Sequence, residues 1–175
     1  DVQSGTLLLT GGSVTNFAGT FTGAGTVDLG AGTFTTTGNF TIPGNLTASG
    51  GAFTFAGATR TIAVTGNFST TGVGVLNMTT ATDSLDIGGN ASFGGGNGTL
   101  NAGVIRLAGN FAQTGTTSFR GLAQSAAVAH RVRLEGAANT TVSFADPANS
   151  FFRRLLVAKG AGTSATITSD VKTTY

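Results

Sequence analysis

The sequence of 175 residues contains no cysteine and no tryptophan, and charged residues make up only 9% of it. The absence of cysteine excludes disulfides, thiolate metal ligands and cysteine catalysis. The low charge is unlike that of disordered chains, which are rich in charged residues. No apolar run approaches the roughly 20 residues that a membrane-spanning helix needs, so we expect no membrane span.

Glycine, threonine and phenylalanine are the residues that stand out instead. The chain has 29 glycines and 13 phenylalanines, and threonine is abundant throughout. Threonine, valine, isoleucine and phenylalanine favour strands, whereas glycine and asparagine supply the backbone conformations of tight turns. Short segments with apolar residues at every second position are bounded by glycine, and they lie at 6–10, 33–37, 52–55, 61–65, 85–87 and 104–107. This pattern predicts short strands joined by turns.

Related phrases recur along the chain at intervals of about 22 residues, with openings at Gly5, Gly25, Gly51, Gly74 and Gly98. A period of this size indicates one structural unit stacked on itself, with variable turns absorbing the differences in length. We therefore predict an all-β fold, a right-handed parallel β-helix of roughly eight coils. A β-sandwich is the alternative, because short strands at similar spacing are also typical of that fold.

Gly-Asn-Phe is the most regular phrase of the repeat. Phe40, Phe68 and Phe111 each follow Gly-Asn, which predicts a stack of aromatic rings at one corner of successive coils. A ladder of asparagine side chains is expected at the same corner, formed by Asn39, Asn45, Asn67, Asn90 and Asn110. The single Gly-rich phrase at 94–98 lacks the aspartate of calcium-binding repeats, so we interpret it as a flexible turn.

Charge divides the chain into two parts. Residues 1–100 have one base against four acids, a net charge of −3, whereas residues 101–175 have eight bases against three acids, a net charge of +5. We expect regular coils over 1–121, and final, more charged coils or a cap of the same solenoid over 122–175, with a helix-compatible composition at 122–129. The weak candidates for surface binding are Arg131, Arg133, Arg153 and Arg154, and a merely solvated face is the alternative.

Several phrases resemble the repeats of very large secreted bacterial proteins, namely VQSGTL at 2–7, FTGAGTV at 21–27, HRVRLEG at 130–136, TVSF at 141–144 and SDV at 169–171. These proteins are the filamentous-haemagglutinin and autotransporter-passenger β-helices. The resemblance implies a right-handed β-helix, a location at the bacterial surface and an adhesive or scaffold role. It transfers no functional residue.

The residues that could carry chemistry are few. His130 is the only histidine, and we predict that its imidazole lies at the surface. Asp83 and Asp86 are three residues apart, so on a strand they would point to opposite faces, and Asp28 occupies a different repeat position. Rows such as Thr35-Thr36-Thr37 are spaced too variably for an ice-binding plane. We expect no catalysis, no metal and no cofactor.

The predicted function is that of an extracellular structural or adhesive β-solenoid of a bacterial surface protein or fibre, secreted or at the cell surface. The alternatives are a glycan-binding module and a carbohydrate-active β-helix enzyme. The expected partners are further solenoid segments stacked end to end and surface glycans, and no specific nucleic acid. We expect the chain to be a mature protein or an excised segment of a longer one.

Overall fold

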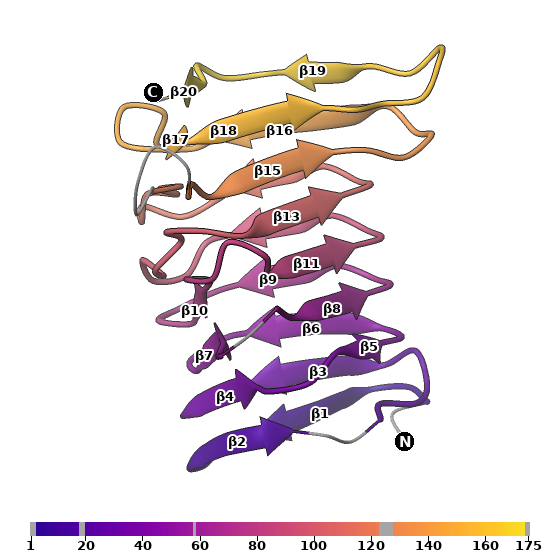
Figure 1. Cartoon of the computed structure of the whole chain (residues 1–175), viewed down its shortest axis with the longest axis vertical. Coiled ribbons are helices and arrows are strands. Elements are labelled where there is room, and N and C mark those ends of the chain that lie inside the picture. The colour runs from indigo at the N-terminus through magenta and orange to yellow at the C-terminus, as the bar shows by residue number, and fades with distance from the viewer. Residues whose placement is uncertain (1–2, 18–19, 58, 123–127, 174–175) are drawn as a thin grey trace.

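The computed structural model describes residues 3–17, 20–57, 59–122 and 128–173 as a stack of coils built from short parallel strands (Figure 1). Every strand pair in this described part is parallel, and it contains no helix. The predicted all-β parallel β-helix is confirmed, with coils about 22 residues apart. The β-sandwich alternative is wrong, because a sandwich requires antiparallel pairs. Most of the helix-compatible stretch, 123–127, lies outside the described residues.

Sheet A is the largest face of the solenoid. Its eight strands, in spatial order, are β1 (Thr6–Leu9), β3 (Thr26–Leu29), β6 (Asn45–Ala48), β9 (Phe68–Thr70), β12 (Ala91–Phe93), β14 (Phe111–Gln113), β16 (Thr140–Phe144) and β19 (Ala165–Ile167). Eight strands stacked in this way enclose about seven turns. At about 4.8 Å per layer, the stack is about 35 Å tall.

Two further faces complete each coil. Sheet B has four strands, β2 (Ser13–Phe17), β4 (Thr33–Thr36), β7 (Ala52–Phe55) and β10 (Val75–Asn77). Sheet C has six strands, β5 (Phe40–Ile42), β8 (Thr61–Val64), β11 (Ser84–Ile87), β13 (Val104–Leu107), β15 (Arg131–Leu134) and β18 (Arg154–Val157). In the upper coils, β17 (Phe151–Phe152) pairs with β20 (Lys172–Thr173).

The chain visits the faces in the order sheet A, sheet B, sheet C. In Figure 1 the strands of sheet A lie behind and run to the left, the strands of sheet C lie in front and run to the right, and the chain rises from the N-terminus. This path is a right-handed coil, the hand that parallel crossover connections almost always have.

The core consists of inward-facing side chains stacked in columns, because alternate residues of a strand point to opposite faces. One column of sheet A follows the strand register through Leu46, Phe68, Ala91, Phe111 and Val142, all of which are buried. Sheet C faces it with an aliphatic column that contains Ile62, Leu85, Ile105 and Val132. The two columns make the interior continuous from coil to coil.

The predicted stack of phenylalanines at one corner is wrong. Phe40 lies in β5 of sheet C, whereas Phe68 and Phe111 lie in sheet A with Ala91 between them. The small side chain of Ala91 leaves room for the ring of Phe93, whose centroid is 5.7 Å from that of Phe68 and 5.3 Å from that of Phe111. The rings therefore form a cluster across the core instead of a column.

The asparagine ladder is present for four of the five expected residues. The side-chain oxygen of Asn45 accepts a hydrogen bond from the backbone N–H of Asn67, and Asn67 does the same for Asn90 and Asn90 for Asn110, each at 2.8 Å. Asn39 belongs to another corner, because its side chain accepts from the backbone N–H of Thr61 at the start of β8. Each ladder contact satisfies a backbone donor where the chain enters sheet A.

The glycines inferred from the sequence as the starts of the repeat units do not occupy equivalent positions in the coil. Gly5 and Gly25 precede strands of sheet A, whereas Gly51 and Gly74 precede strands of sheet B. Along sheet A, successive asparagine contacts join residues 22, 23 and 20 positions apart, and the contact from Asn110 to Thr141 spans 31. The long coil accommodates the segment that follows β14.

Candidate functional site

Sheet C carries three of the four predicted arginines on its outer surface. Arg131 and Arg133 alternate with the buried Val132 and Leu134 in β15, so both point outward. Arg154, exposed at the start of β18, lies directly opposite Arg131. Arg153 lies between β17 and β18, outside both strands. The structure therefore brings Arg131, Arg133 and Arg154 together and places Arg153 beside them at a corner.

Arg106 is a fourth member of this surface that the sequence analysis missed. It lies in β13 directly opposite Arg133. The sequence could have identified Arg106, because VIRL at 104–107 and RVRL at 131–134 have the same alternation and place an arginine at the same position. We name the set of Arg106, Arg131, Arg133 and Arg154 the basic ladder. Its members form two like-charged pairs on neighbouring strands, an arrangement that is unfavourable by itself.

Carboxylates relieve part of this repulsion. The Nε atom of Arg106 lies 3.6 Å from Oδ1 of Asp86, and Nε of Arg133 lies 2.9 Å from Oε2 of Glu135. Both pairs are partly exposed to solvent, where ion pairs contribute little to stability. Within the described ranges, Arg131 and Arg154 form no ion pair. The basic ladder therefore keeps two uncompensated positive charges side by side.

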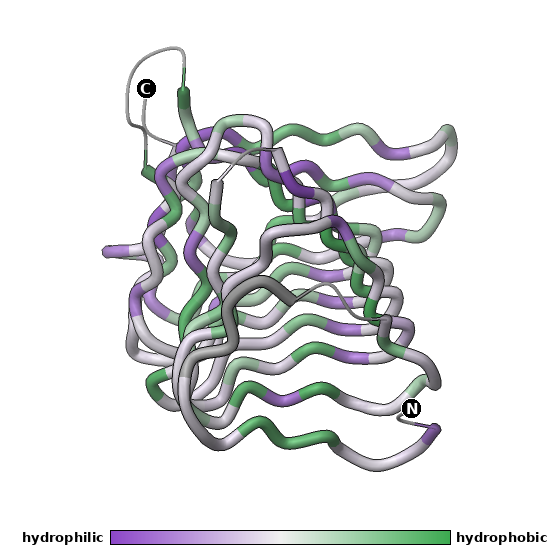
Figure 2. The backbone as a smooth tube through the Cα atoms, turned by 60° about the horizontal axis from the view of Figure 1, so that its bottom comes forward, coloured by the Kyte–Doolittle hydropathy of each residue, from purple (hydrophilic) through white to green (hydrophobic). Residues whose placement is uncertain are grey.

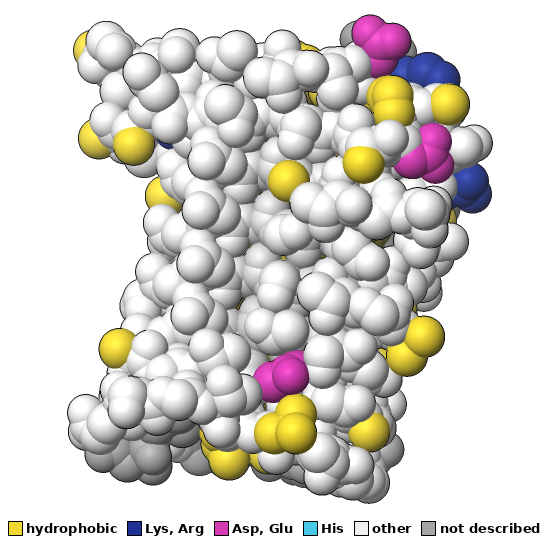
Figure 3. Space-filling view, turned by 180° about the vertical axis from the view of Figure 1, so that it is seen from behind, with side chains coloured by type: hydrophobic (Ala, Val, Ile, Leu, Met, Phe, Trp, Pro, Cys, Tyr) yellow, Lys and Arg dark blue, Asp and Glu magenta, His cyan; other side chains and the backbone are white. Residues whose placement is uncertain are grey.

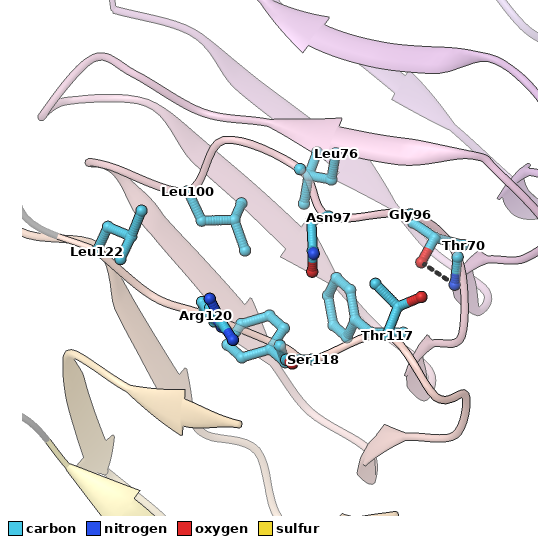
Figure 4. Close-up of a pocket in the computed structure, with 13 residues that line it drawn as sticks. Thr70, Leu76, Gly96, Asn97, Leu100, Thr117, Ser118, Arg120 and Leu122 are labelled. Carbon is cyan, nitrogen blue, oxygen red and sulfur yellow. Dashed lines mark hydrogen bonds between the residues drawn. The ribbon is translucent and has the colours of Figure 1, made fainter. Parts of the chain in front are cut away.

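A pocket of about 200 Å³ lies on the side of the solenoid where sheet B ends (Figure 4). Above β10, the strands of this side are replaced by single bridges from Met78 to Leu100 and from Leu100 to Gly121. Four largely buried apolar side chains, those of Leu76, Phe93, Leu100 and Phe119, line its floor. The pocket is thus an interruption of one face over an intact core.

The first wall of the pocket is the Gly-rich turn at 94–98. A Cβ atom on Gly95 would lie 2.2 Å from the carbonyl oxygen of Gly74, and one on Gly98 would lie 1.9 Å from that of Leu76. Only glycine fits so close to the coil below. Asn97 is the one residue of 94–98 that is not glycine, and its side chain is therefore the only one that this wall offers to a ligand. The sequence predicted a flexible turn here; the structure has a bend at Gly95, and the close approach of Gly95 and Gly98 gives the segment a packing role.

The second wall is the segment that follows β14, and buried polar groups hold it in place. The buried side chain of Gln113 donates from Nε2 to the carbonyl oxygens of Gly115 and of Thr117, the latter at 3.0 Å. Its Oε1 accepts from the backbone N–H of Asp146 at 2.7 Å. The backbone N–H of Phe119 donates to Oγ of Ser150 at 3.1 Å. These contacts fix both ends of the wall.

The polar side chains at the mouth of the pocket are unpaired. Asn97, Thr117, Ser118 and Arg120 line it, and none of their side chains forms a hydrogen bond or an ion pair with the residues that the structure describes. Figure 4 shows Asn97 extending from the Gly-rich turn toward the segment that carries the other three. No sequence motif marked this set, because its two walls come from different coils.

The prediction that His130 lies at the surface is wrong. The side chain is 1% exposed, its Nε2 has no partner in the described structure, and its ring centroid is 6.1 Å from that of Phe119. Burial, with a smaller contribution from the positive charge of Arg131, lowers its pKa from 6.5 to about 3. His130 is in the same phase as Val132 and Leu134, so the alternation directs it inward.

Asp83 and Asp86 point to different environments, as their spacing predicts. Asp83 is buried, and its Oδ1 accepts from the backbone N–H of Arg60 at 3.0 Å. Burial raises the pKa of Asp83, and hydrogen bonds from Arg60 and Thr80 partly oppose this. Asp86 lies on the outer surface of sheet C. In the described ranges, no three histidine or acidic residues are grouped so that they could hold a metal ion.

No helix long and apolar enough to cross a membrane occurs among the described residues. Comparison of the chain with protein-family models, with curated proteins and with solved structures finds no match.

Proposed function

We propose that this chain is a structural module of a bacterial surface protein or fibre, an extracellular solenoid that extends by stacking end to end and performs no catalysis. The observation that carries the proposal is that apolar side chains are exposed at both ends of the stack of coils. Leu7 in β1 is 39% exposed and Ile167 in β19 is 53% exposed, although both belong to inward-facing columns of sheet A. Figure 2 shows the apolar residues of β1 at the outermost coil.

Both ends also leave strand edges unpaired. Among the residues that the structure describes, β1 has a neighbour only on the side of β3, and β19 only on the side of β16. An unpaired edge above an open apolar column is a template for another strand. A neighbouring solenoid segment or a second copy of the chain can supply that strand. Since the two end coils present different surfaces, head-to-tail contact between copies would repeat without closing and would produce a filament. The resemblance to filamentous-haemagglutinin and autotransporter-passenger repeats supports the extracellular, adhesive setting.

Electron microscopy and sedimentation test the stacking. We expect rods whose length increases with protein concentration in steps of about 35 Å, the height of seven layers. Leu7→Lys and Ile167→Lys place a charge on each end and should each reduce the rods to single units. Val73→Lys is the matched control, because Val73 is 74% exposed but does not lie at an end. Single units at every concentration, or rods in both end variants, would contradict the proposal.

A second candidate function is binding of acidic glycans by the basic ladder. It is favoured by the two like-charged pairs, Arg106 with Arg133 and Arg131 with Arg154, because an anionic chain lying across them would relieve the repulsion. Heparin affinity should fall in Arg131→Ala and Arg154→Ala, decrease with added salt and remain unchanged in Lys172→Ala. Equal affinity in all three variants would remove this candidate.

A further inference from the structure

The pocket above β10 combines an apolar floor with a polar mouth, and Arg120 is the only charged residue among the described residues that line it. We propose that it binds the terminal acidic sugar of a glycan, a single six-membered ring that carries a carboxylate. The proposal rests on the adhesive role proposed above for its biological setting, but not on end-to-end stacking.

The size of the pocket fits one ring. Its volume is about 200 Å³. Pockets for drug-sized ligands are larger, about 300 to 1,000 Å³. The space is therefore suited to a single sugar residue at a chain end, and a continuous polysaccharide would not fit within it.

The chemistry of the mouth fits a carboxylate and neighbouring hydroxyls. The guanidinium of Arg120 can donate two parallel hydrogen bonds to a carboxylate, and no aspartate or glutamate lines the pocket to compete for it. The amide of Asn97 and the hydroxyls of Thr117 and Ser118 can each donate and accept, as sugar hydroxyls require. All four side chains are free in the described structure, so binding would break no existing side-chain contact.

The floor suits the apolar face of a sugar ring. Leu76, Phe93, Leu100 and Phe119 are held from below by the core, where the ring centroid of Phe119 lies 4.8 Å from that of Phe93 and 4.9 Å from that of Phe111. The fixed contacts of Gln113 and Ser150 keep the second wall in position. A pre-formed site of this kind avoids much of the ordering cost of binding.

Titration monitored by NMR amide shifts tests the proposal, with sodium glucuronate as the probe and glucose as its neutral control. We expect glucuronate to bind with a Kd of about 1 mM and to shift amides at 95–98 and 117–122. Glucose should bind at least about tenfold more weakly, the loss expected without a charge-assisted hydrogen bond. Absence of these shifts at about 20 mM glucuronate, or equal affinity for glucose, would overturn the proposal.

Three variants separate the pocket from the rest of the surface. Arg120→Ala should raise the Kd for glucuronate about tenfold or more, and Ser118→Phe should abolish binding by filling the pocket. Lys172→Ala removes an exposed cation that lies outside both the pocket and the basic ladder, and it should leave the Kd unchanged. Thermal unfolding must show that each variant is folded. An Arg120→Ala protein that is folded and binds like the native one would overturn the assignment of the carboxylate to this residue.

The position of the sugar in its chain is tested with two oligosaccharides. One with glucuronate at its non-reducing end should bind like the free sugar, and one with only internal glucuronate should not bind. Failure of the first would overturn the assignment to a chain end. Rod formation, measured separately with Leu7→Lys and Ile167→Lys, decides the proposed structural role, so the two failures are distinguishable.

Discussion

Sheet A and the sheet B side are two faces of the same coils, yet one is continuous and the other is interrupted. Sheet A passes through all eight layers, and the asparagine ladder accompanies it. Sheet B ends at β10 and is followed by isolated bridges and by the pocket. The residues that recur most often, such as those of the asparagine ladder, therefore stabilise the stack of coils. The polar side chains at the mouth of the pocket, which have no partner in the described structure, lie where sheet B is interrupted.

The outer surface of sheet A illustrates the first half of this contrast. Small polar residues follow one another in register, including Thr47, Ser69 and Ser92, and the hydroxyls of Thr47 and Ser69 lie 3.0 Å apart. Viewed from behind in Figure 3, one acidic side chain lies near the base, charged side chains lie at the upper right, apolar ones are scattered, and the rest of the described surface is uncharged and polar or backbone. The hydroxyls of Ser92 and Thr114 form a second pair of this kind, so short side chains of this face bond to one another between coils.

The largest effect should follow from damage to the aromatic core beneath sheet A. Phe111 is fully buried, and its ring centroid lies 4.9 Å from those of both Phe119 and Phe152. Phe111→Ala should lower the free energy of unfolding by about 3–5 kcal/mol, through lost burial and the cavity left behind. Urea unfolding measures this, with the exposed Val73→Ala as a control within about 0.5 kcal/mol of the native protein. A loss below about 1 kcal/mol for Phe111→Ala would contradict the described packing.

The burial of His130 should make the free energy of unfolding depend on pH. Its pKa is about 3 in the folded protein against 6.5 for a free imidazole, so the unfolded chain binds the extra proton between these values. Stability should therefore fall as pH decreases from about 6.5 to 3, by up to about 1.4 kcal/mol per pH unit. Asp83 contributes with the opposite sign, because its raised pKa makes the folded state hold a proton just above pH 3.8.

His130→Leu separates the two groups. Denaturant unfolding between pH 4.5 and 6.5 should show a distinctly smaller slope for this variant than for the native protein. Equal slopes would show that the imidazole is protonated in the folded state and hence that it is not buried as described.

The asparagine ladder should contribute less per residue. Asn67→Ala removes the acceptor of the 2.8 Å hydrogen bond from the backbone N–H of Asn90 and should cost about 1 kcal/mol. Asn101→Ala is a matched control, since no side-chain hydrogen bond links Asn101 to the described residues. Thermal unfolding of the two variants compares them. Equal losses would mean that the ladder contact has no net effect on stability.

The smallest effect is expected on sheet C. Arg154→Ala removes one member of the like-charged pair with Arg131 and should raise stability by a few tenths of a kcal/mol at low salt. The gain should disappear at about 1 M salt, where the Debye length is about 3 Å. Urea unfolding at both salt concentrations measures it. A gain that persists at high salt would have another cause than charge repulsion.

Much of the architecture was predictable because it depends on local pattern. Alternation within short segments identified the strands, and the recurrence of Gly-Asn identified one corner. The errors have specific physical causes. Gly-Asn-Phe occurs at two different corners, before β5 and before β9, so sequence identity did not imply equivalent position. The general preference of histidine for the surface was misleading for His130, although its phase with Val132 indicated burial.

The candidate sites were less accessible to sequence reasoning. The basic ladder was found in part because Arg131 and Arg133 lie in one alternating strand, and Arg106 was missed because its contact with Arg133 depends on the strand register. The pocket was missed altogether. Asn97 and Arg120 come from successive coils, and the variable length of the coil after β14 hides how they align.

Amide hydrogen exchange compares the continuous and interrupted faces most directly. We predict the slowest exchange in β6, β9, β12 and β14 of sheet A, and faster exchange at 94–99 and 114–119, which lie outside the strands. Glucuronate should slow exchange at 94–99 and 114–119 but not in the four strands of sheet A. Equal protection of the sheet A strands and of these two segments, or faster exchange in sheet A, would contradict our account. In that account sheet A supplies the stability and the interrupted sheet B side binds the ligand.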